Sequence, residues 1–423
     1  MKKLLALALA LVMMLGCIGM TACSDETDGD QLKVGVILIG DENEGYTYAH
    51  ISGIKKAVEN LGGSDKVEVI WKYNVKEDQT CFDQAEYLVS EGCDVIFSNS
   101  YGHQSYILEA AKKYPEVQFV AVTGDTAASQ NLPNFSNAFN KTYESRYVSG
   151  VVAGMKIKEL VEQNKLTDAN YDADGNVKVG YVGAFPYAEV VSGYTAYYLG
   201  IRSVYEKVAM TVQYTDSWFS LTGEAAAAQQ LAAQGCVIIC QHADSTGAPS
   251  EVQSHKDGGQ VIYSVGYNID MLAVAPTAAL TSATNDWSKY YTYAISTVMN
   301  GEKIATNWSA GYSEDAVGIT ALGPECAAGT AEKVAEVEAA LKAGTLKVFD
   351  VSTFTVTKTE TSNTGATVDA NGHLTAYLAD INADFVGETN VIADGCFQES
   401  DAAQYRSAPY FDVRIDGITE ITK

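Results

Sequence analysis

Three short apolar segments occur twice in the chain in the same order, and this repeat restricts the possible folds more than any other feature. The pairs, at nearly equal spacing, are KVGVILIG at 33 and KVGYVGAF at 178, GCDVIFSNSYG at 92 and GCVIICQHADSTG at 235, and VAVTG and YSVG ending at 124 and 266. A helix-patterned stretch with a Gly-Ile pair follows the first segment of each set. The repeat predicts two similar lobes.

Strands and helices are expected to alternate within each lobe. In the first half, apolar runs at 33–39, 67–73, 95–98 and 118–123 alternate with helix-patterned stretches at 51–61, 81–91 and 105–114. Such alternation is typical of a parallel sheet with helices on both faces. We therefore predict an α/β protein with two doubly wound parallel sheets. A helix at 288–299 and a strand at 316–322 are expected to cross between the lobes and form a hinge, and 332–342 is expected to be a closing helix.

The composition changes along the chain suggest where the domains begin and end. Thr-rich alternation with Asn-Gly turn signals begins near residue 348, which indicates a small β-rich extension. The expected division is a lipoprotein signal peptide at 1–22, a tether at 23–30, lobe 1 at 31–138 and 277–303, lobe 2 at 139–276 and 304–346, and the extension at 347–423.

The first residues have the pattern of a lipoprotein signal. Lys2 and Lys3 precede an apolar run, and Met-Thr-Ala precedes Cys23. This pattern predicts lipidation at Cys23, with Cys17 as the alternative, and an anchor on the extracytoplasmic face of the cell membrane. No later stretch has 18 consecutive apolar residues, so no other segment is expected to span a membrane.

Charge and cysteine usage exclude several classes of protein. The chain has 53 acidic and 28 basic residues and a net charge of −25, which excludes nucleic-acid binding through a basic face. The later cysteines lack the C-x-x-C spacing of a zinc site, and buried free thiols are favoured over disulfides. These cysteines are Cys81, Cys93, Cys236, Cys240, Cys326 and Cys396. Neither a metal nor a cofactor is expected.

Ligands of open α/β sheets bind beyond the carboxyl ends of the strands, so the loops at those ends are the candidate site. Aromatic residues gather there, and their flat faces can stack on a flat ligand, while neighbouring Asp, Asn, His and Ser side chains can bind its edge. The candidate ligand-binding residues are Tyr46, Tyr48, Tyr101, Phe185, Trp218, His242, Asp244, Ser245, Tyr267, Asn268, Asp270 and Trp287.

The known enzyme motifs are mostly absent. His242, Asp244 and Ser245 have the residue types of a catalytic triad, but such close positions on one loop cannot place nucleophile, base and orienting group in a line. Ligand recognition is therefore favoured over catalysis. Asp244 and Asp270 are expected to accept hydrogen bonds from N–H groups of the ligand, with helix capping as the alternative. The acidic run at 168–176 lacks the later ligands of a calcium loop and is expected to be a solvated turn.

Several separated segments together resemble one known family. GYTYAH, YESRYVSGVVAG, KVGYVGAFPYAEVVSG, CQHADST, VGYNIDM and APTAALTSATNDW, in this order, are similar to the basic membrane protein family of ABC-transporter substrate-binding lipoproteins. The resemblance implies a two-lobed type I periplasmic-binding fold, purine nucleosides or nucleobases as ligands, and an ABC permease as partner. It also implies a stacking role for Tyr46. Asn268 and Asn285 stand where the nucleoside-binding branch has Asp and Lys, so a free purine base is favoured over a nucleoside.

The resulting hypothesis is a monomeric, lipid-anchored substrate-binding protein of an ABC importer that holds a purine-type ligand between its lobes. Two alternatives belong to other classes. One is an extracellular nucleoside hydrolase that uses His242 and Ser245. The other is a sensory lipoprotein that signals through a membrane partner.

Overall fold

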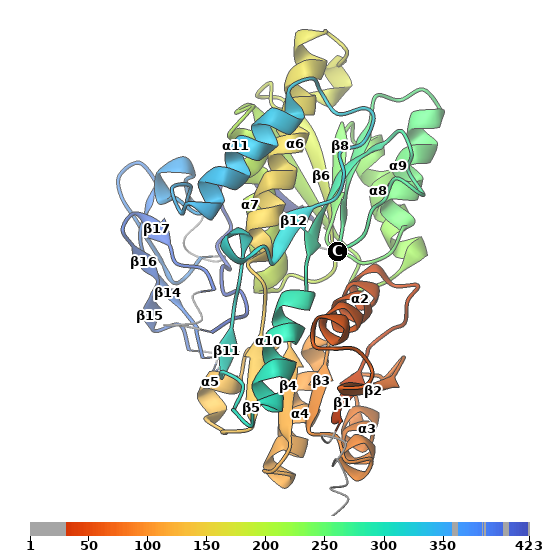
Figure 1. Ribbon diagram of the computed structural model, residues 1–423. Coiled ribbons are helices and arrows are strands. Elements are labelled where there is room, and N and C mark those ends of the chain that lie inside the picture. Colours follow the sequence, from red (N-terminus) through yellow and green to blue (C-terminus); the bar gives the residue numbers. More distant parts are fainter. Residues whose placement is uncertain (1–30, 358–362, 383, 385, 401–405, 422–423) are drawn as a thin grey trace, which may run out of the picture.

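The computed structural model describes residues 31–357, 363–382, 384, 386–400 and 406–421. Within them, two lobes lie one above the other, each with a mainly parallel sheet between helices (Figure 1). This arrangement confirms the predicted α/β class with two sheets. The expected signal peptide, the tether and the lipidation site at Cys23 lie outside the described residues. In the part of the chain that is described, no helix has the length and apolar character needed to cross a membrane.

The first lobe is built on a six-stranded parallel sheet with the order β11-β5-β4-β3-β1-β2. Alternate residues of each strand face opposite helix layers, so that Val34 and Val36 pack with α2 and α10 while Ile37 packs with α3 and α4. The elements are β1 (Leu32–Ile37), α2 (Gly45–Asn60), β2 (Val67–Lys72), α3 (Gln79–Ser90), β3 (Val95–Ser98), α4 (Gln104–Lys113), β4 (Gln118–Val122), α5 (Ala127–Gln130), β5 (Phe135–Ala138), α10 (Ser288–Met299) and β11 (Asn307–Trp308).

The second lobe is built on a seven-stranded sheet with the order β12-β10-β9-β8-β6-β7-β18. Only β12 is antiparallel among its described strands. The elements are α6 (Thr142–Glu162), β6 (Val177–Gly183), α7 (Ala188–Arg202), β7 (Val208–Tyr214), α8 (Leu221–Ala233), β8 (Ile238–Gln241), α9 (Gly247–Asp257), β9 (Tyr263–Tyr267), β10 (Ala279–Asn285), β12 (Val317–Ile319), α11 (Thr330–Lys342) and β18 (Ile418–Ile421).

Three segments cross between the lobes, as the hinge hypothesis requires. They join β5 to α6, β10 to α10, and β11 to β12, and backbone hydrogen bonds link them, including Phe139 N to Trp308 O at 3.0 Å and Asp286 N to Ala316 O at 2.8 Å.

The lobe boundaries differ from the predicted ones at two places. Residues 277–303 were expected in the first lobe, but β10 belongs to the second sheet because it pairs with β9 and β12. Conversely, β11 lies in the first sheet although 304–346 was expected in the second lobe.

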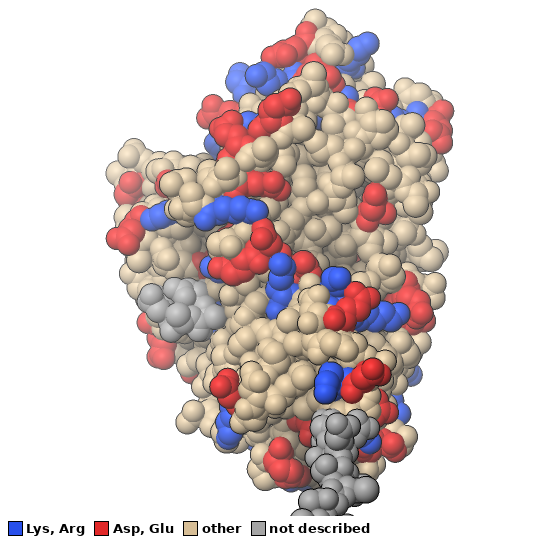
Figure 2. Space-filling view, in the orientation of Figure 1, with Lys and Arg blue, Asp and Glu red and all other residues tan. Residues whose placement is uncertain are grey.

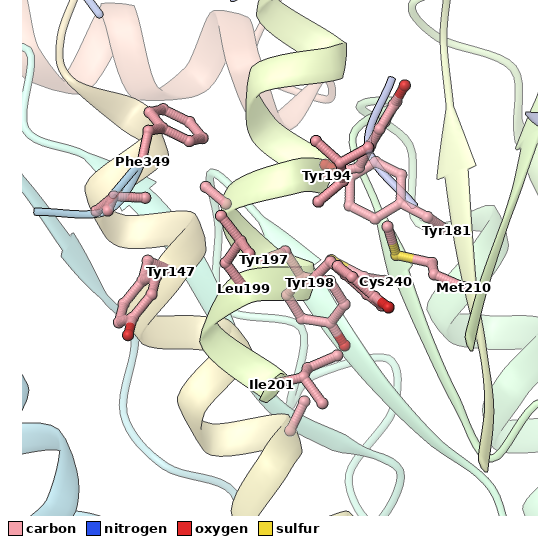
Figure 3. Close-up of a cluster of buried hydrophobic side chains, with 14 of the residues drawn as sticks. Tyr147, Tyr181, Tyr194, Tyr197, Tyr198, Leu199, Ile201, Met210, Cys240 and Phe349 are labelled. Atoms are coloured by element: carbon pink, nitrogen blue, oxygen red, sulfur yellow. The ribbon is translucent and has the colours of Figure 1, made fainter. Parts of the chain in front are cut away.

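The C-terminal extension contains small antiparallel ladders but is not a separate unit. Its strands are β13 (Ala366–Val368), β14 (Leu374–Ala379), β15 (Thr389–Asn390), β16 (Ile392–Ala393) and β17 (Cys396–Phe397). They lie beside the second lobe, on the left in Figure 1. Phe349, at the start of the extension, belongs to the same buried cluster as the α7 residues Tyr194 and Tyr197 (Figure 3). The extension thus shares the core of the second lobe.

Two smaller expectations are met in the described residues. The six cysteines are free thiols, all of them buried except the half-buried Cys326. Burial raises the pKa of the Cys240 thiol to about 12, which makes it unreactive. The acidic run at 168–176 begins with a short 3-10 helix, Asp168–Asn170, and ends in a turn in which Asp172 accepts hydrogen bonds from the backbone of Asp174 and Asn176. On the face drawn in Figure 2, lysines and arginines are interspersed with acidic residues.

Candidate functional site

A pocket lies between the lobes, at the carboxyl ends of the central strands of both sheets. The lobes touch beside it, where the Cα of Gly45 is so close to the second lobe that a Cβ there would meet Ile269 at 3.3 Å. The empty space of the pocket, including the part open to solvent, is about 550 Å³. It is lined by Ile39, Glu44, Tyr46, Asn99, Ser100, Tyr101, Thr123, Phe139, Thr142, Glu189, Trp218, His242, Asp244, Tyr267, Asn285 and Trp287.

Some of the predicted residues line this pocket, and others lie elsewhere. Those at the pocket are Tyr46, Tyr101, Trp218, His242, Asp244, Tyr267 and Trp287. Phe185 instead packs on Tyr187 and Trp218, with ring centroids 5.2 Å from each. Ser245 lies behind the pocket, where its backbone N–H donates to the Glu224 carboxylate. Tyr48, Asn268 and Asp270 line a neighbouring groove beside α2.

Asp270 corrects one prediction. It was expected to accept hydrogen bonds from the ligand, but its side chain is exposed and accepts a bond from the backbone N–H of Leu272 at 2.8 Å. Asp270 thus stabilises a turn after β9, and it caps no helix, because the next described element is β10. Asp244 differs from it, because α9 begins after Thr246 and has no side-chain cap, while Asp244 lines the pocket.

An aromatic cluster supports one wall of the pocket. Tyr46 meets the ring of His50 edge-on, with centroids 4.5 Å apart, and His50 stacks on Trp287 at 4.4 Å. The Tyr46 hydroxyl donates to the backbone oxygen of Asn99, and His50 Nδ1 lies 2.8 Å from the Tyr291 hydroxyl. Burial lowers the pKa of His50 to about 3, so its ring is neutral. These contacts fix the orientation of the Tyr46 and Trp287 rings.

Three carboxyl groups line the pocket, and burial raises the pKa of each. The pKa of Glu189 rises to about 7 because its carboxyl group is desolvated, with Asp125 adding to the effect. Burial also raises the pKa of Asp244, and the negative charges of Glu44, Glu224 and Glu189 raise it further. The pKa of Glu44 rises for the same main reason. A site of this kind disfavours an anionic ligand and favours one that offers hydrogen-bond donors.

A buried arginine compensates part of this negative charge. Arg146 on α6 lies behind Tyr267, with its guanidinium 3.7 Å from the ring centroid, and Nη1 donates to the backbone oxygen of Gln241 at 2.7 Å. Its positive charge acts to lower the pKa values of Asp244 and Glu189, against the effect of burial. Arg146 is not among the lining residues, so it acts on the pocket through the field rather than by contact.

A chain of amide side chains connects Asp244 to the hinge. Asn268 donates to Asp244 Oδ1 at 3.1 Å, Asn285 donates to Asn268 Oδ1 at 3.4 Å, and the Thr142 hydroxyl donates to Asn285 Oδ1 at 2.8 Å. Asn268 and Asn285, which depart from the pattern of the resembling family, therefore bond to each other. Their amide groups hold Asp244 and the crossing segments in register.

The geometry gives no support to catalysis by His242 and Ser245. His242 Nδ1 lies 3.1 Å from the Tyr181 hydroxyl, and burial lowers the His242 pKa well below its usual range. The Ser245 hydroxyl oxygen accepts a bond from the backbone N–H of Gly247 at 3.1 Å. A nucleophile and base within hydrogen-bond reach, which a triad requires, are thus not formed by this pair. In the described ranges, no group of three His, Cys, Asp or Glu side chains could hold a metal ion.

Sequence reasoning missed several lining residues, above all Glu44 and Glu189. Both acids lie in the strand-end loops that the sequence singles out, directly before or at the start of a helix. A carboxylate in a loop is usually solvated, so the residue type gave no signal. The position beyond a strand end was the only available indication.

Comparisons with known proteins agree with this fold. The family model described as "ABC transporter substrate-binding protein PnrA-like" matches residues 33–348. A purine-binding protein of Brucella abortus is 34% identical over 76% of this chain and 83% of its own length. A putative ABC transporter glucose-binding protein of Haloferax volcanii is 26% identical, over 78% of this chain and 76% of its own length.

Solved structures extend the likeness to the fold. A solute-binding protein of an ABC transporter system from Aeropyrum pernix superposes with a TM-score of 0.61 at 16% identity, covering 75% of this chain and 93% of its own. The predicted resemblance to the basic membrane protein family is confirmed, since basic membrane protein A of Borreliella burgdorferi is also a relative, 22% identical over 67% of this chain and 76% of its own. The chain belongs to the family of PnrA-like substrate-binding proteins of ABC transporters.

Proposed function

We propose that this protein is the lipid-anchored binding component of an ABC importer and that its lobes close on a purine-type ligand. The observation that carries the proposal is the pocket between the lobes, which combines aromatic rings with the buried carboxyl groups of Glu44 and Asp244 and the half-buried one of Glu189. The name of the Brucella abortus relative supports the same ligand class.

The chemistry of the pocket favours a purine over other small metabolites. A purine ring is flat and can lie against Tyr46 or Trp287, and stacking of this kind is worth about 1 to 3 kcal/mol per base. Its ring and exocyclic N–H groups can satisfy the carboxyl groups of Asp244 and Glu189, whose ionised forms are costly without donors. Nucleotides are disfavoured because their phosphates would face these acids.

Isothermal calorimetry tests the ligand class. We expect heat of binding from one or more of adenine, guanine, hypoxanthine, xanthine and their nucleosides, and none from the corresponding nucleotides. The Haloferax volcanii relative makes glucose the necessary comparison. Binding of glucose or an amino acid, with no binding of any purine, would overturn the proposal.

Replacing Tyr46 with Ala is expected to weaken purine binding by about 1 to 3 kcal/mol, roughly 5-fold to 150-fold, because one aromatic wall is lost. The matched control is Tyr48→Ala, since Tyr48 is two residues away on the same helix but exposed and outside the pocket. Calorimetry of both variants measures the effect. Equal purine affinities of Tyr46→Ala and the parent protein would show that Tyr46 does not contribute to ligand binding.

The membrane anchor has its own test. Cys23→Ala is expected to abolish labelling by a radioactive fatty acid and to leave the protein unprocessed or released into the medium, because the thiol is the acceptor of the lipid. Gel electrophoresis of cell and medium fractions measures this outcome. Persistent labelling of Cys23→Ala, with loss of label in Cys17→Ala, would show that the lipid is attached to Cys17 instead.

A further inference from the structure

The C-terminal extension reaches from the second lobe across one side of the cleft to the first. It is fixed to the second lobe by β18, which pairs in parallel with β7, and by packing of Phe349 on Tyr143 of α6 with ring centroids 5.2 Å apart. On the first lobe, Arg406 Nη1 lies 3.5 Å from Asp125 Oδ2. The Ser407 backbone N–H donates to Asn307 Oδ1 at 3.2 Å.

A second chamber lies between the extension and the cleft. Four residues, Tyr101, Thr123, Glu189 and Trp218, line both this chamber and the pocket described above. The opposite wall comes from described residues of the extension, namely Thr364, Gly365, Tyr377, Leu378, Ala379, Asp380, Gly387, Arg406, Ala408, Pro409, Tyr410 and Asp412. Its empty space, including the part open to solvent, is about 1450 Å³, against about 550 Å³ for the first pocket. The two spaces adjoin, and the second is the larger.

The second chamber differs from the first in its chemistry as well as its size. Carboxylates from both walls face it, including Asp125, Glu189 and Asp412, together with the guanidinium of Arg406. Both partners of the Arg406–Asp125 pair are buried, and Asp125 also accepts from the Tyr101 hydroxyl at 3.2 Å and from Gln104 at 3.0 Å. The tyrosines Tyr187, Tyr377 and Tyr410 complete the wall.

Such a wall suits a substituent that is rich in hydroxyl groups. Hydroxyls both donate and accept, so they can bond to carboxylates and to a guanidinium at once. An apolar substituent would offer no further donors to these carboxylates, of which Asp125 and Asp412 already pair with Arg406 and Arg414. A phosphate would face several acids for a single arginine.

We propose that the second chamber is a subsite for a hydroxylated substituent, such as a sugar, attached to a ring held in the first pocket. The proposal rests on the proposed function, because it assumes a purine-type ring there. It also offers a sugar a place other than the hinge side, where Asn268 and Asn285 bond to each other. Since the matched family region ends at 348, this wall is a feature of the chain outside that region.

The test uses a substitution that narrows the second chamber and leaves the residues of the first pocket unchanged. Leu378 on β14 lines the chamber and is 45% exposed, so Leu378→Trp adds bulk there at little risk to folding. The matched control is Val386→Trp, because Val386 is 51% exposed on the same extension and is not a lining residue. Calorimetry with hypoxanthine and inosine, and with adenine and adenosine, compares base with nucleoside, and melting temperatures check the fold.

In the parent protein and in Val386→Trp, we expect at least one nucleoside to bind 10-fold or more tightly than its base. In Leu378→Trp, we expect this ratio to fall to about one while the base keeps its affinity. An unchanged ratio in Leu378→Trp, or bases that bind as tightly as nucleosides in the parent, would overturn the subsite but keep the proposed function. If the parent binds neither bases nor nucleosides, the proposed function itself fails.

Discussion

Replacing Asp244 with Asn is expected to weaken binding of the tightest purine ligand by about 1.5 to 3 kcal/mol, roughly 10-fold to 150-fold in affinity. It is also expected to change the order of preference among purines. Asp244 lines the pocket and accepts one bond from Asn268, which leaves carboxylate acceptor capacity for ligand N–H groups. An amide would present a donor where the carboxylate presents an acceptor. Ligands that offer N–H at this point should therefore lose most affinity.

Asp270→Asn is the matched control for Asp244→Asn. The chemical change is the same, but Asp270 is exposed and bonds to Leu272 outside the pocket, so its ligand affinities should match those of the parent. Titrations with adenine, guanine and hypoxanthine measure the order of preference, and thermal unfolding measures stability. A lower melting temperature in Asp244→Asn with the order of preference unchanged would assign Asp244 a structural role only.

Glu189→Gln is expected to remove a pH dependence from the stability of the ligand-free protein. The folded-state pKa of Glu189 is raised to about 7 from 4.5, so folding stabilises the protonated form. The contribution of Glu189 to the free energy of unfolding is complete below pH 4.5 and is lost as the pH rises through 7. The free energy of unfolding should therefore fall by up to about 3 kcal/mol over this range. Glutamine does not ionise, so the parent should lose more stability than the variant between pH 4.5 and 7.5.

Chemical denaturation of both proteins at several pH values measures this difference. Glu206→Gln is the control, because the Glu206 side chain is 83% exposed and its replacement should leave the pH profile of the parent unaltered. If N–H groups of the ligand bond to ionised Glu189, bound ligand should reduce the loss of stability that accompanies rising pH. Purine affinity should therefore increase over the same pH range. Parallel stability profiles for the parent and Glu189→Gln would contradict the assignment.

The sequence predicted the strand ends well because the pattern that marks them is local. The run before His242 is short, apolar and closed by polar residues, and it forms β8 with four buried positions. Parallel strands bring their carboxyl ends to one edge of each sheet, and the pocket lies between these two edges, so Tyr46 of the first lobe and Trp218 of the second both line it.

Side-chain direction was harder to predict than strand position. Helix α2 begins at Gly45, six residues before the expected start, so Tyr46 and Tyr48 lie on a helix and not in a loop. Residues two apart on a helix point to different sides, and only Tyr46 faces the pocket. Asp244 and Asp270 likewise follow strand ends in similar loops, but only the fold of each loop decides which carboxylate turns inward.

Burial produced by contact between lobes has no local signal. Glu44 and Glu189 look like ordinary solvated loop acids in the sequence, yet both line the pocket between the lobes, where burial raises their pKa values. The sequences of β10 and β18 likewise carry no local signal of the sheet to which each strand belongs, because that is decided by strands distant in the sequence. β18 has only four residues, so its pairing with β7 follows from the packing of the extension rather than from its own pattern.

The position of β18 also sets an order of events in folding. This strand, at 418–421, completes the sheet of a lobe whose other strands begin at residue 177. Until these residues have been synthesised, the edge of β7 has no partner there, and exposed strand edges can pair with other chains. A chain in which both lobes have folded before the extension docks therefore still carries an open sheet edge at β7, and docking of the extension closes it.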